Sequence, residues 1–266
     1  MNKKLRNVKI NPKNERVNLE SVLVSLASES KINEVLVEAG PTLSADFIEQ
    51  GLVGEPTQVL VRDSHSGILP TKDRPNGMLS DEFLDPALAQ GGVLIDLCHS
   101  VYLTRYFLGR PESITASFGY VTGRNVEDNA VLTMQHANGS IGVAHAGYVT
   151  CAAPFNIEVH GTEGTIVFDQ ERLNEIQLFT RQNDPATDGF RTILTGPLHP
   201  PYSAFLPNGG HNLGYMDVKI CELHDLLTSI ESGEDVWPNF EAGLIIEKVM
   251  DAVDRSAREQ RWVNVE

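Results

Sequence analysis

Residues 91–109 contain the side chains of this chain that are best placed to do chemistry. The segment has a glycine pair at 91–92, a carboxylate at Asp96, an imidazole at His99 and a Leu-Gly pair at 108–109. Residues three apart share one face of a helix, so Asp96 and His99 can point into the same cleft. The spacing also suits a buried helix in which Asp96 caps and His99 is a satisfied core residue. Spacing alone does not separate the two interpretations.

Residues 91–108 are predicted to form one helix that positions this pair. Glycine has backbone freedom that other residues lack, so the chain can pass close to another segment just before the helix. Gly109 is a natural end for it, because glycine favours the C-terminal cap conformation. A shorter helix is predicted over residues 80–88, where Ser80 can act as the N-cap.

A series of short strands is predicted around this helix. Asn138-Gly139 is a strong hairpin signal, and residues 161–164 predict a second tight turn. Strands joined by short turns must pair antiparallel, because a parallel pair needs a long crossover. The predicted strands cover residues 58–62, 113–118, 130–136, 141–148, 155–160, 165–168 and 176–180.

The C-terminal third is predicted to be irregular first and helical afterwards. Residues 183–213 are rich in Pro, Gly, Asn and His, and so long a loop inside a compact domain is usually functional or mobile. Helices are predicted over residues 215–232 and 240–260; the second has an apolar stripe that faces a core. Residues 262–265 are predicted to form an edge strand.

Composition and charge limit the partners. The 266 residues have a net charge of -15 at pH 7, which argues against nucleic acid and anionic membranes, since both would repel the chain. No apolar run approaches the roughly 18 residues that span a bilayer. The three cysteines are far apart and none lies in a Cys-x-x-Cys pair, as expected for reduced thiols in the cytoplasm.

The first 53 residues differ in character from the rest. Residues 1–16 are basic, whereas the remainder is acidic overall. Apolar spacing predicts a helix over 19–27, a buried strand over 34–38 and, after a Gly-Pro-Thr turn, a helix over 43–50. We expect a small helix–strand–helix segment at 1–53 and a second domain at 54–266.

The second domain resembles the C-terminal domain of the Gfo/Idh/MocA oxidoreductases, the glucose–fructose oxidoreductase and inositol dehydrogenase relatives. The motifs that carry the resemblance are Gly54-Glu55-Pro56, the 61–65 strand end, the 91–109 helix, the 158–164 strand and turn, and the final helix with Trp262. The resemblance implies an α+β fold, namely an open, largely antiparallel sheet with helices packed on one face. The other sheet face commonly makes an oligomer interface in such enzymes, so a homo-oligomer is expected.

The same resemblance assigns roles to residues of the predicted site. In that family the helix histidine, here His99, binds a substrate hydroxyl and helps to move its proton while hydride goes to NAD(P), and the aspartate, here Asp96, supports it. Histidine suits the role because its unperturbed pKa lies near neutrality. The family spaces the pair four apart, whereas here they are three apart. Either the helix is locally adjusted or Asp96 faces elsewhere.

The resemblance does not extend to the dinucleotide-binding domain that precedes this domain in the family. The chain has no Gly-x-Gly-x-x-Gly, and residues 37–41, the counterpart of the catalytic lysine motif, have no lysine. NAD(P) is therefore implied by resemblance only, with a binding site that looks incomplete and no complete Rossmann domain. Residues 33–53 instead resemble the reductase domain of the riboflavin-biosynthesis deaminase/reductase. We interpret the chain as a hybrid, natural or artificial; the alternative is a diverged family member whose first segment matches by chance.

Further candidates for substrate contacts lie outside the helix. Arg62 and His65 end a predicted strand, where His65 either lines the cleft or is a surface loop residue. His211 and Asn212 lie in the irregular segment where relatives often place substrate contacts, although a mobile loop histidine would look the same. No pair of residues has the spacing of a metal site, and no Gly-x-Ser-x-Gly elbow supports a serine hydrolase.

Three functions remain open. We predict a sugar- or polyol-dehydrogenase-like substrate domain with little independent turnover, because nothing visible holds a nicotinamide close to a small polyhydroxy substrate. The first alternative is an active NAD(P)-dependent oxidoreductase. The second is a non-catalytic oligomerising or structural hybrid.

Overall fold

The computed structural model describes residues 51–266 except 76, 80–83, 90–91, 153, 183, 200–201 and 234–237, together with 10–11, 16–17 and Ile48. The predicted helices at 19–27 and 43–50 and the strand at 34–38 lie outside the described residues, apart from Ile48. The chain divides into two units, one of residues 1–38 and 215–237 and the other of residues 39–214 and 238–266.

The first unit contains two short strands and one helix that the structure describes. β1 (Ile10–Asn11) pairs antiparallel with β2 (Arg16–Val17). α6 (Tyr215–Ser232) is the helix predicted over these residues.

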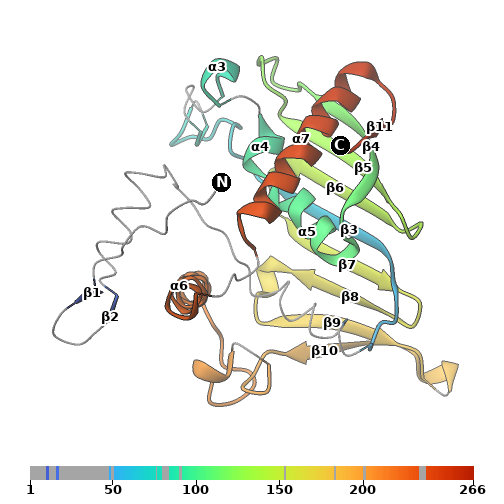
Figure 1. The fold of residues 1–266 in the computed structure, drawn as a ribbon, viewed down its shortest axis with the longest axis vertical. Coiled ribbons are helices and arrows are strands. Elements are labelled where there is room, and N and C mark those ends of the chain that lie inside the picture. The colour runs from blue at the N-terminus through green and yellow to red at the C-terminus, as the bar shows by residue number, and fades with distance from the viewer. Residues whose placement is uncertain are drawn as a thin grey trace. The chain divides into compact units, whose positions relative to one another are not determined.

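The second unit is built on a nine-stranded sheet with the order β10-β9-β8-β7-β3-β6-β5-β4-β11 (Figure 1). Every pairing is antiparallel except that of β3 with β6, which is parallel. The strands are β3 (Pro56–Ser64), β4 (Pro111–Gly119), β5 (Asn129–His136), β6 (Ile141–Gly147), β7 (Phe155–Gly161), β8 (Gly164–Asp169), β9 (Glu175–Thr180), β10 (Phe190–Leu194) and β11 (Val263–Asn264). This confirms the predicted mixed fold with a largely antiparallel sheet.

The alternation of buried and exposed residues along each strand separates the two faces of the sheet. Across the centre, Ile157, Val61, Ala144 and Leu132 lie side by side on one face and are all buried. The helices α4 (Val93–Asp96), α5 (His99–Leu108) and α7 (Phe240–Glu259) contribute buried residues to the apolar clusters over this face (Figure 1). The other face, here called the open face, carries half-buried and exposed side chains.

Two predictions about local structure were wrong. The helix predicted over 91–108 is two helices, because the chain makes a turn at Leu97 and Cys98 between α4 and α5. The irregular segment 183–213 contains β10, which pairs with β9 at the edge of the sheet. The alternation of apolar residues along a short edge strand is a weak sequence signal, and the surrounding prolines and glycines hide it. In the region predicted as a helix over 80–88, the described helix is α3 (Pro86–Ala89).

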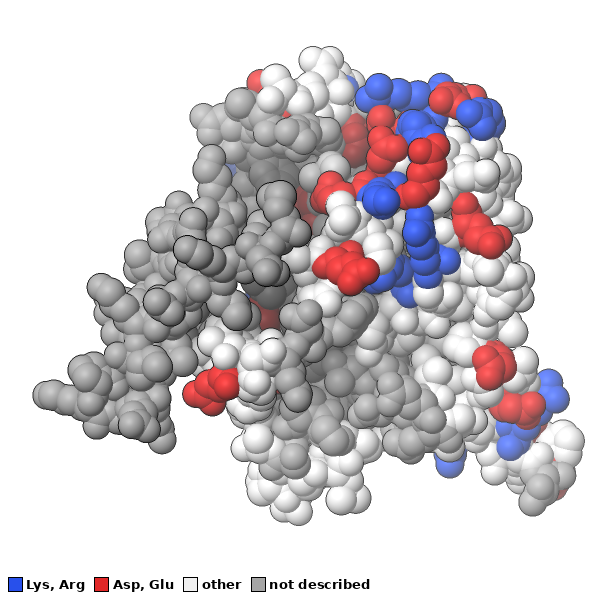
Figure 2. Space-filling model, in the orientation of Figure 1, with Lys and Arg blue, Asp and Glu red and all other residues white. Residues whose placement is uncertain are grey.

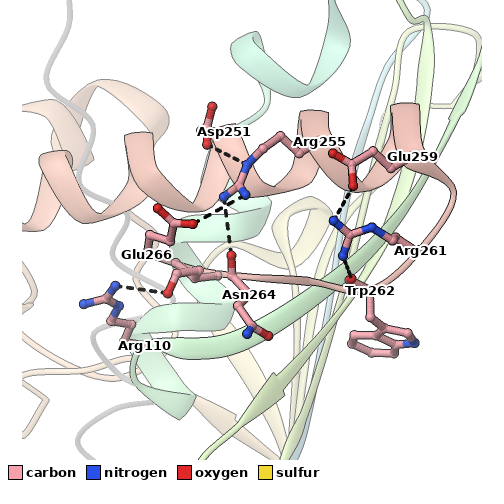
Figure 3. A network of polar contacts seen from close by, with 9 residues as sticks. Arg110, Asp251, Arg255, Glu259, Arg261, Trp262, Asn264 and Glu266 are labelled. Carbon is pink, nitrogen blue, oxygen red and sulfur yellow. Dashed lines mark hydrogen bonds and ion pairs between the residues drawn. The ribbon is translucent and has the colours of Figure 1, made fainter.

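The C-terminal strand is attached to α7 by a mixed-charge network (Figure 3). Arg255 contacts Asp251 at 2.9 Å and Glu266 at 3.8 Å and donates to the Asn264 carbonyl. Arg110 donates to the carbonyl of Val265. Figure 2 shows that acidic and basic side chains are intermixed over α7, so this surface presents no single-sign patch. No described helix is both long and apolar enough to cross a membrane.

Candidate functional site

His65 is held at the end of β3 by backbone hydrogen bonds to the segment after β6. Its N–H donates to the Gly147 carbonyl at 2.8 Å, and its own carbonyl accepts from the Thr150 N–H at 3.3 Å. These bonds prolong the parallel pairing of β3 and β6 and place the imidazole beside the fully buried Tyr148. The two ring centroids are 5.1 Å apart.

The hydrogen bonds of His65 determine where its ring proton lies. Nδ1 accepts a hydrogen bond from the Gly67 N–H at 2.9 Å, so Nδ1 has no proton in this arrangement. The proton of the neutral ring is then on Nε2, which lies 3.9 Å from Oδ2 of Asp96. The imidazole therefore presents a donor toward this carboxylate.

Asp96 is the last residue of α4, and His99 is the first residue of α5. Burial would raise the pKa of Asp96, but the polar hydrogens of His65 and Tyr148 and the charges of His65 and His99 outweigh it, so this pKa is lowered. The helix is thus locally adjusted: the turn between α4 and α5 lets Asp96 approach His65 while its carboxylate also interacts with His99. Asp96 is ionised at neutral pH.

Asp63 is a second carboxyl group in the same cluster. It lies two residues before His65 and pairs with Ala146 and Phe155 on the helix-covered face of the sheet. Its side chain is buried, and burial raises its pKa to about 7; the charge of His65 opposes this rise and the charge of Asp96 adds to it. The site therefore combines one ionised carboxylate with one carboxyl group that titrates near neutrality.

Glu127 fixes the start of α4. Its Oε1 accepts from the N–H groups of Gly92 at 3.0 Å and Leu94 at 3.2 Å, and its carbonyl accepts from the Val93 N–H. A Cβ on residue 92 would collide with the carbonyl oxygen of Glu127. The glycine at 92 is thus required because the backbone of Glu127 passes against it, and the carboxylate also complements the helix dipole.

The thiol next to the site is not a nucleophile. Cys98 lies between α4 and α5, and burial together with the charges of Glu247 and Asp96 raises its pKa to about 11. The thiolate, which is the reactive form, is therefore scarce at neutral pH.

Arg62 is on the opposite side of β3 from Asp63 and lies on the open face. Its Nη2 donates to Oδ1 of Asn156 at 2.7 Å across the strand pair. His211 is exposed, and its ring contacts the Asn208 carbonyl; Asn212 follows it in the same loop. The structure therefore brings His65, Asp96 and His99 together, whereas Arg62 points to the other face of β3 and His211 and Asn212 lie in an exposed loop.

Three residues of the cluster were not predicted from the sequence. Asp63 had a usable signal, because two residues along a strand face the same side and His65 was already a candidate. Tyr148 becomes a neighbour of His65 only through the parallel pairing of β3 with β6, which no local pattern announces. Glu127 lies in a loop without periodicity, so its capping role has no sequence signal.

The N-termini of α4 and α7 are capped by side chains. A helix N-terminus attracts phosphate, but the N-terminus of α4 already holds the Glu127 carboxylate, which would repel one. At α7 the Asn239 side chain accepts from the Ala242 N–H. Within the described part of the chain, no group of three or more His, Cys, Asp or Glu side chains is arranged to hold a metal ion.

Comparison with protein families gives two matches. The model of the oxidoreductase family C-terminal alpha/beta domain, shared by the Gfo/Idh/MocA proteins, matches residues 47–265. The model of the RibD C-terminal domain matches residues 1–60, few of which the structure describes.

Individual relatives are dehydrogenases. Levoglucosan dehydrogenase of Pseudarthrobacter phenanthrenivorans is 29% identical over 84% of this chain, and inositol 2-dehydrogenase of Rhizobium meliloti is 23% identical over 82%. The chain spans 63% and 59% of these two proteins. A solved structure of levoglucosan dehydrogenase in complex with NADH superposes with a TM-score of 0.76 at 28% identity, covering 85% of this chain and 62% of that one. A structure of an NAD binding oxidoreductase from Klebsiella pneumoniae gives 0.75 at 28% identity, covering 93% and 69%.

Proposed function

Because the chain belongs to the Gfo/Idh/MocA oxidoreductase family through its C-terminal α/β domain, we propose that this domain binds a small polyhydroxy molecule of the sugar or polyol class. The observation that carries the proposal is the ionised Asp96 beside the Nε2–H of His65, with His99 close to the same carboxylate. An acceptor and donors at one place match a hydroxyl group, which both donates and accepts hydrogen bonds. The names of the relatives, levoglucosan and inositol dehydrogenases, agree with this ligand class.

In the proposed complex each side chain has its own role. The Asp96 carboxylate accepts a hydrogen bond from the ligand hydroxyl, and the Nε2–H of His65 donates one to a neighbouring oxygen. His99 is proposed to handle the proton of the reacting hydroxyl, because imidazole can take up and return a proton near neutral pH. Arg62, His211 and Asn212 stay candidates for substrate contact that depend on how the ligand lies.

We propose that this domain has little dehydrogenase turnover on its own. Oxidising a hydroxyl-bearing carbon requires a hydride acceptor held against the substrate. The Glu127 carboxylate at the N-terminus of α4, which would repel a phosphate, supports the proposal. An active NAD(P)-dependent oxidoreductase is the alternative, in which residues outside the described ones or another chain hold the nicotinamide.

Calorimetric titration of the full chain tests this function. Levoglucosan, L-sorbose and inositol serve as ligands, followed by NAD(H) and NADP(H). We expect saturable binding of at least one polyol, about tenfold or more weaker in Asp96→Asn, since a hydrogen bond to a charged group contributes about 1.5–3 kcal/mol. Asp73→Asn, which makes the same charge change at an exposed loop residue, is the matched control and should bind like wild type.

The outcomes separate the alternatives. Saturable dinucleotide binding would contradict low turnover and favour the active enzyme. Absence of binding for all three polyols would contradict a substrate domain and favour a structural role. The binding is assigned to this site only if Asp96→Asn lowers the polyol affinity and Asp73→Asn does not.

Three further parts of the proposal concern the whole chain. Residues 1–53 are proposed to be a separate reductase-like segment joined to the domain at 54–266, which the match to the RibD C-terminal domain supports. A homo-oligomer is proposed to form through the open face of the sheet. A cytoplasmic location is proposed from three free cysteines, Cys98, Cys151 and Cys221.

A further inference from the structure

The two edges of the nine-stranded sheet differ in how they are protected. An edge strand presents backbone N–H and C=O groups to which another strand can pair, and proteins usually protect such edges with charged side chains, short strands or a covering segment. β11 forms one edge and has only two residues. Arg110, Arg255 and Glu266 surround it with charge, and two of them donate to carbonyls of the C-terminal segment.

β10 forms the other edge and is longer and more exposed (Figure 1). Of its five residues only Ile193 is half-buried; the others are exposed, and the apolar side chains of Phe190 and Leu194 are 55% and 49% exposed. Its one charged side chain, Arg191, donates through Nη2 to the hydroxyl of Thr180 at 3.0 Å and is therefore directed back to β9. Within the described residues, β9 is the one strand that pairs with β10.

We propose that β10 pairs with β10 of a second copy of this chain, antiparallel and about a two-fold axis that passes through Thr192. The two sheets then continue into one another across the pair. This interface is separate from the one proposed on the open face and does not rest on it, because the edge and the face of one sheet can each contact a different copy. An assembly that uses both interfaces has the symmetry of a tetramer with perpendicular two-fold axes.

The sequence of β10 is complementary to itself in this register. Directly opposite residues of an antiparallel pair lie on the same face, so a two-fold axis perpendicular to the sheet must pass through a residue. With the axis at Thr192, Phe190 lies opposite Leu194 of the second copy, and Arg191 lies opposite Ile193. All five residues are then paired, and no like charges lie opposite each other.

The neighbouring registers are less favourable. An axis through Arg191 would place two guanidinium groups directly opposite each other, and like charges in this position destabilise a strand pair. An axis through Ile193 would place Phe190 opposite residue 196, which lies outside the strand. The register centred on Thr192 is therefore the one that the residues of β10 favour.

Contacts with β9 orient the side chains that would meet in this pair. The rings of Phe190 and Phe179 pack with their centroids 5.7 Å apart. The Thr192 hydroxyl accepts from the Gln177 amide at 2.9 Å and donates to its oxygen at 3.2 Å. In the proposed pair, Leu194 of the second copy covers the side of Phe190 that faces away from Phe179. Apolar cross-strand pairs of this kind stabilise antiparallel sheets.

Charges placed on the two-fold axis test the pairing. Thr192→Lys puts two ammonium groups opposite each other and Thr192→Glu puts two carboxylates there, whereas a mixture of the two variants pairs opposite charges. In sedimentation velocity of the full chain, we expect the dissociation constant of each variant alone to be at least about fivefold above that of the mixed pair. Thr187→Lys adds the same charge at an exposed position of the loop before β10 and should associate like wild type.

The outcomes separate this interface from the open face. Val131→Glu changes the open face alone and should leave the effect of the Thr192 variants in place. Association that Val131→Glu abolishes and that the Thr192 variants leave unchanged would overturn the edge pairing and retain the open-face oligomer. Equal association of the mixture and of the separate Thr192 variants would overturn it as well, and so would a wild type that stays monomeric.

A measurement on the wild type decides if the variants do not fold. Strand pairing protects backbone amides from hydrogen exchange. We expect amides of residues 190–194 to exchange more slowly at high than at low protein concentration, while those of the β9 residues are unchanged. Exchange of residues 190–194 that does not depend on protein concentration would overturn the proposal.

Discussion

Asp63 and Asp96 show how two identical side chains in one cluster acquire opposite protonation behaviour. Asp63 is buried and Asp96 is half-buried, which disfavours the charged form of each. Asp96 has polar hydrogens and positive charge around it that outweigh this cost, whereas at Asp63 burial and the charge of Asp96 outweigh the opposing charge of His65. Burial therefore determines the direction of the pKa shift at Asp63, whereas the neighbouring groups determine it at Asp96.

The raised pKa of Asp63 predicts how stability depends on pH. The folded protein binds this proton more tightly than the unfolded chain, whose aspartates titrate near 3.8, so the stabilisation is complete below that value and is lost as pH rises through about 7. The full effect is on the order of 4 kcal/mol in the free energy of unfolding. Urea unfolding at pH 5 and pH 8 should capture about 2.7 kcal/mol of this effect, because the unfolded aspartate has already lost its proton at pH 5.

The comparison with variants isolates Asp63 from the other acids. Asp63→Asn has no carboxyl group to ionise, so it should gain stability relative to wild type between pH 5 and pH 8. Asp73→Asn, an exposed position, should keep a constant difference from wild type. A constant difference for Asp63→Asn as well would show that Asp63 does not titrate in this range.

At the residue scale, the sequence predicted one half of the cluster. Asp96 and His99 were marked by the glycine pair before them and the Leu-Gly after them, and His65 by its place after a strand. Tyr148 could not be predicted, because its contact with His65 depends on pairing between strands that are far apart in the chain. The direction in which Asp96 points depends on the turn at Leu97 and Cys98. The sequence only suggested this turn, because Asp96 and His99 are three residues apart and not four.

At the scale of elements, the junction of α4 with Glu127 positions the site. α4 has only four residues and is too short to be stable by its own hydrogen bonds. The carboxylate and carbonyl of Glu127 accept three of its first backbone N–H groups, those of residues 92–94. The position of Asp96 at the end of this helix therefore depends on a residue in a distant loop.

A pair of glycine substitutions tests this junction. Gly92→Ala forces its Cβ against the backbone of Glu127, which should cost about 1–3 kcal/mol of unfolding free energy. Gly243→Ala, in α7, adds a Cβ into open space and should stabilise by about 1 kcal/mol through helix propensity. Thermal and urea unfolding of both variants measure the sign of the change in unfolding free energy. Equal changes at the two positions would contradict the role of Gly92.

Strand and helix positions were largely predictable, whereas the place of each strand in the sheet was not. The predicted strands after α5 correspond to β4 through β9, because their alternation and turn residues are local signals. β3 lies between β6 and β7 although it precedes both by many residues. Its central position follows from long-range packing of Val59 and Val61, which no neighbouring residue indicates.

At the scale of the whole molecule, the open face is the surface through which a second copy is proposed to bind. Its central row includes Asn156, Arg62, His145 and Val131, of which Val131 is 46% exposed. Half-buried apolar side chains on neighbouring strands extend this row; they are Leu60, Ile141, Val143 and Val167. Broad and partly apolar surfaces of this kind are typical of homo-oligomer interfaces.

A charge placed on the open face tests the proposed oligomer. Val131→Glu would bury a carboxylate between two copies, so the dissociation constant should rise at least tenfold. Val121→Glu places the same charge at a 71% exposed turn residue away from the strands and should leave the assembly unchanged. Sedimentation velocity over a range of protein concentrations compares the two variants with the wild type. A wild type that stays monomeric at all concentrations would contradict the proposed oligomer.

The position of β3 has a consequence for the order of folding events. β3 bonds to β6 and β7, so Arg62 reaches partners such as Asn156 that are 94 residues away. Closing such long loops is slow, and during synthesis β3 leaves the ribosome well before either neighbour exists. His65 and Asp63 acquire their environment only when these pairings close. A ligand should therefore bind only to the folded protein and not to a folding intermediate. Ligand added during refolding should slow unfolding but should not speed folding.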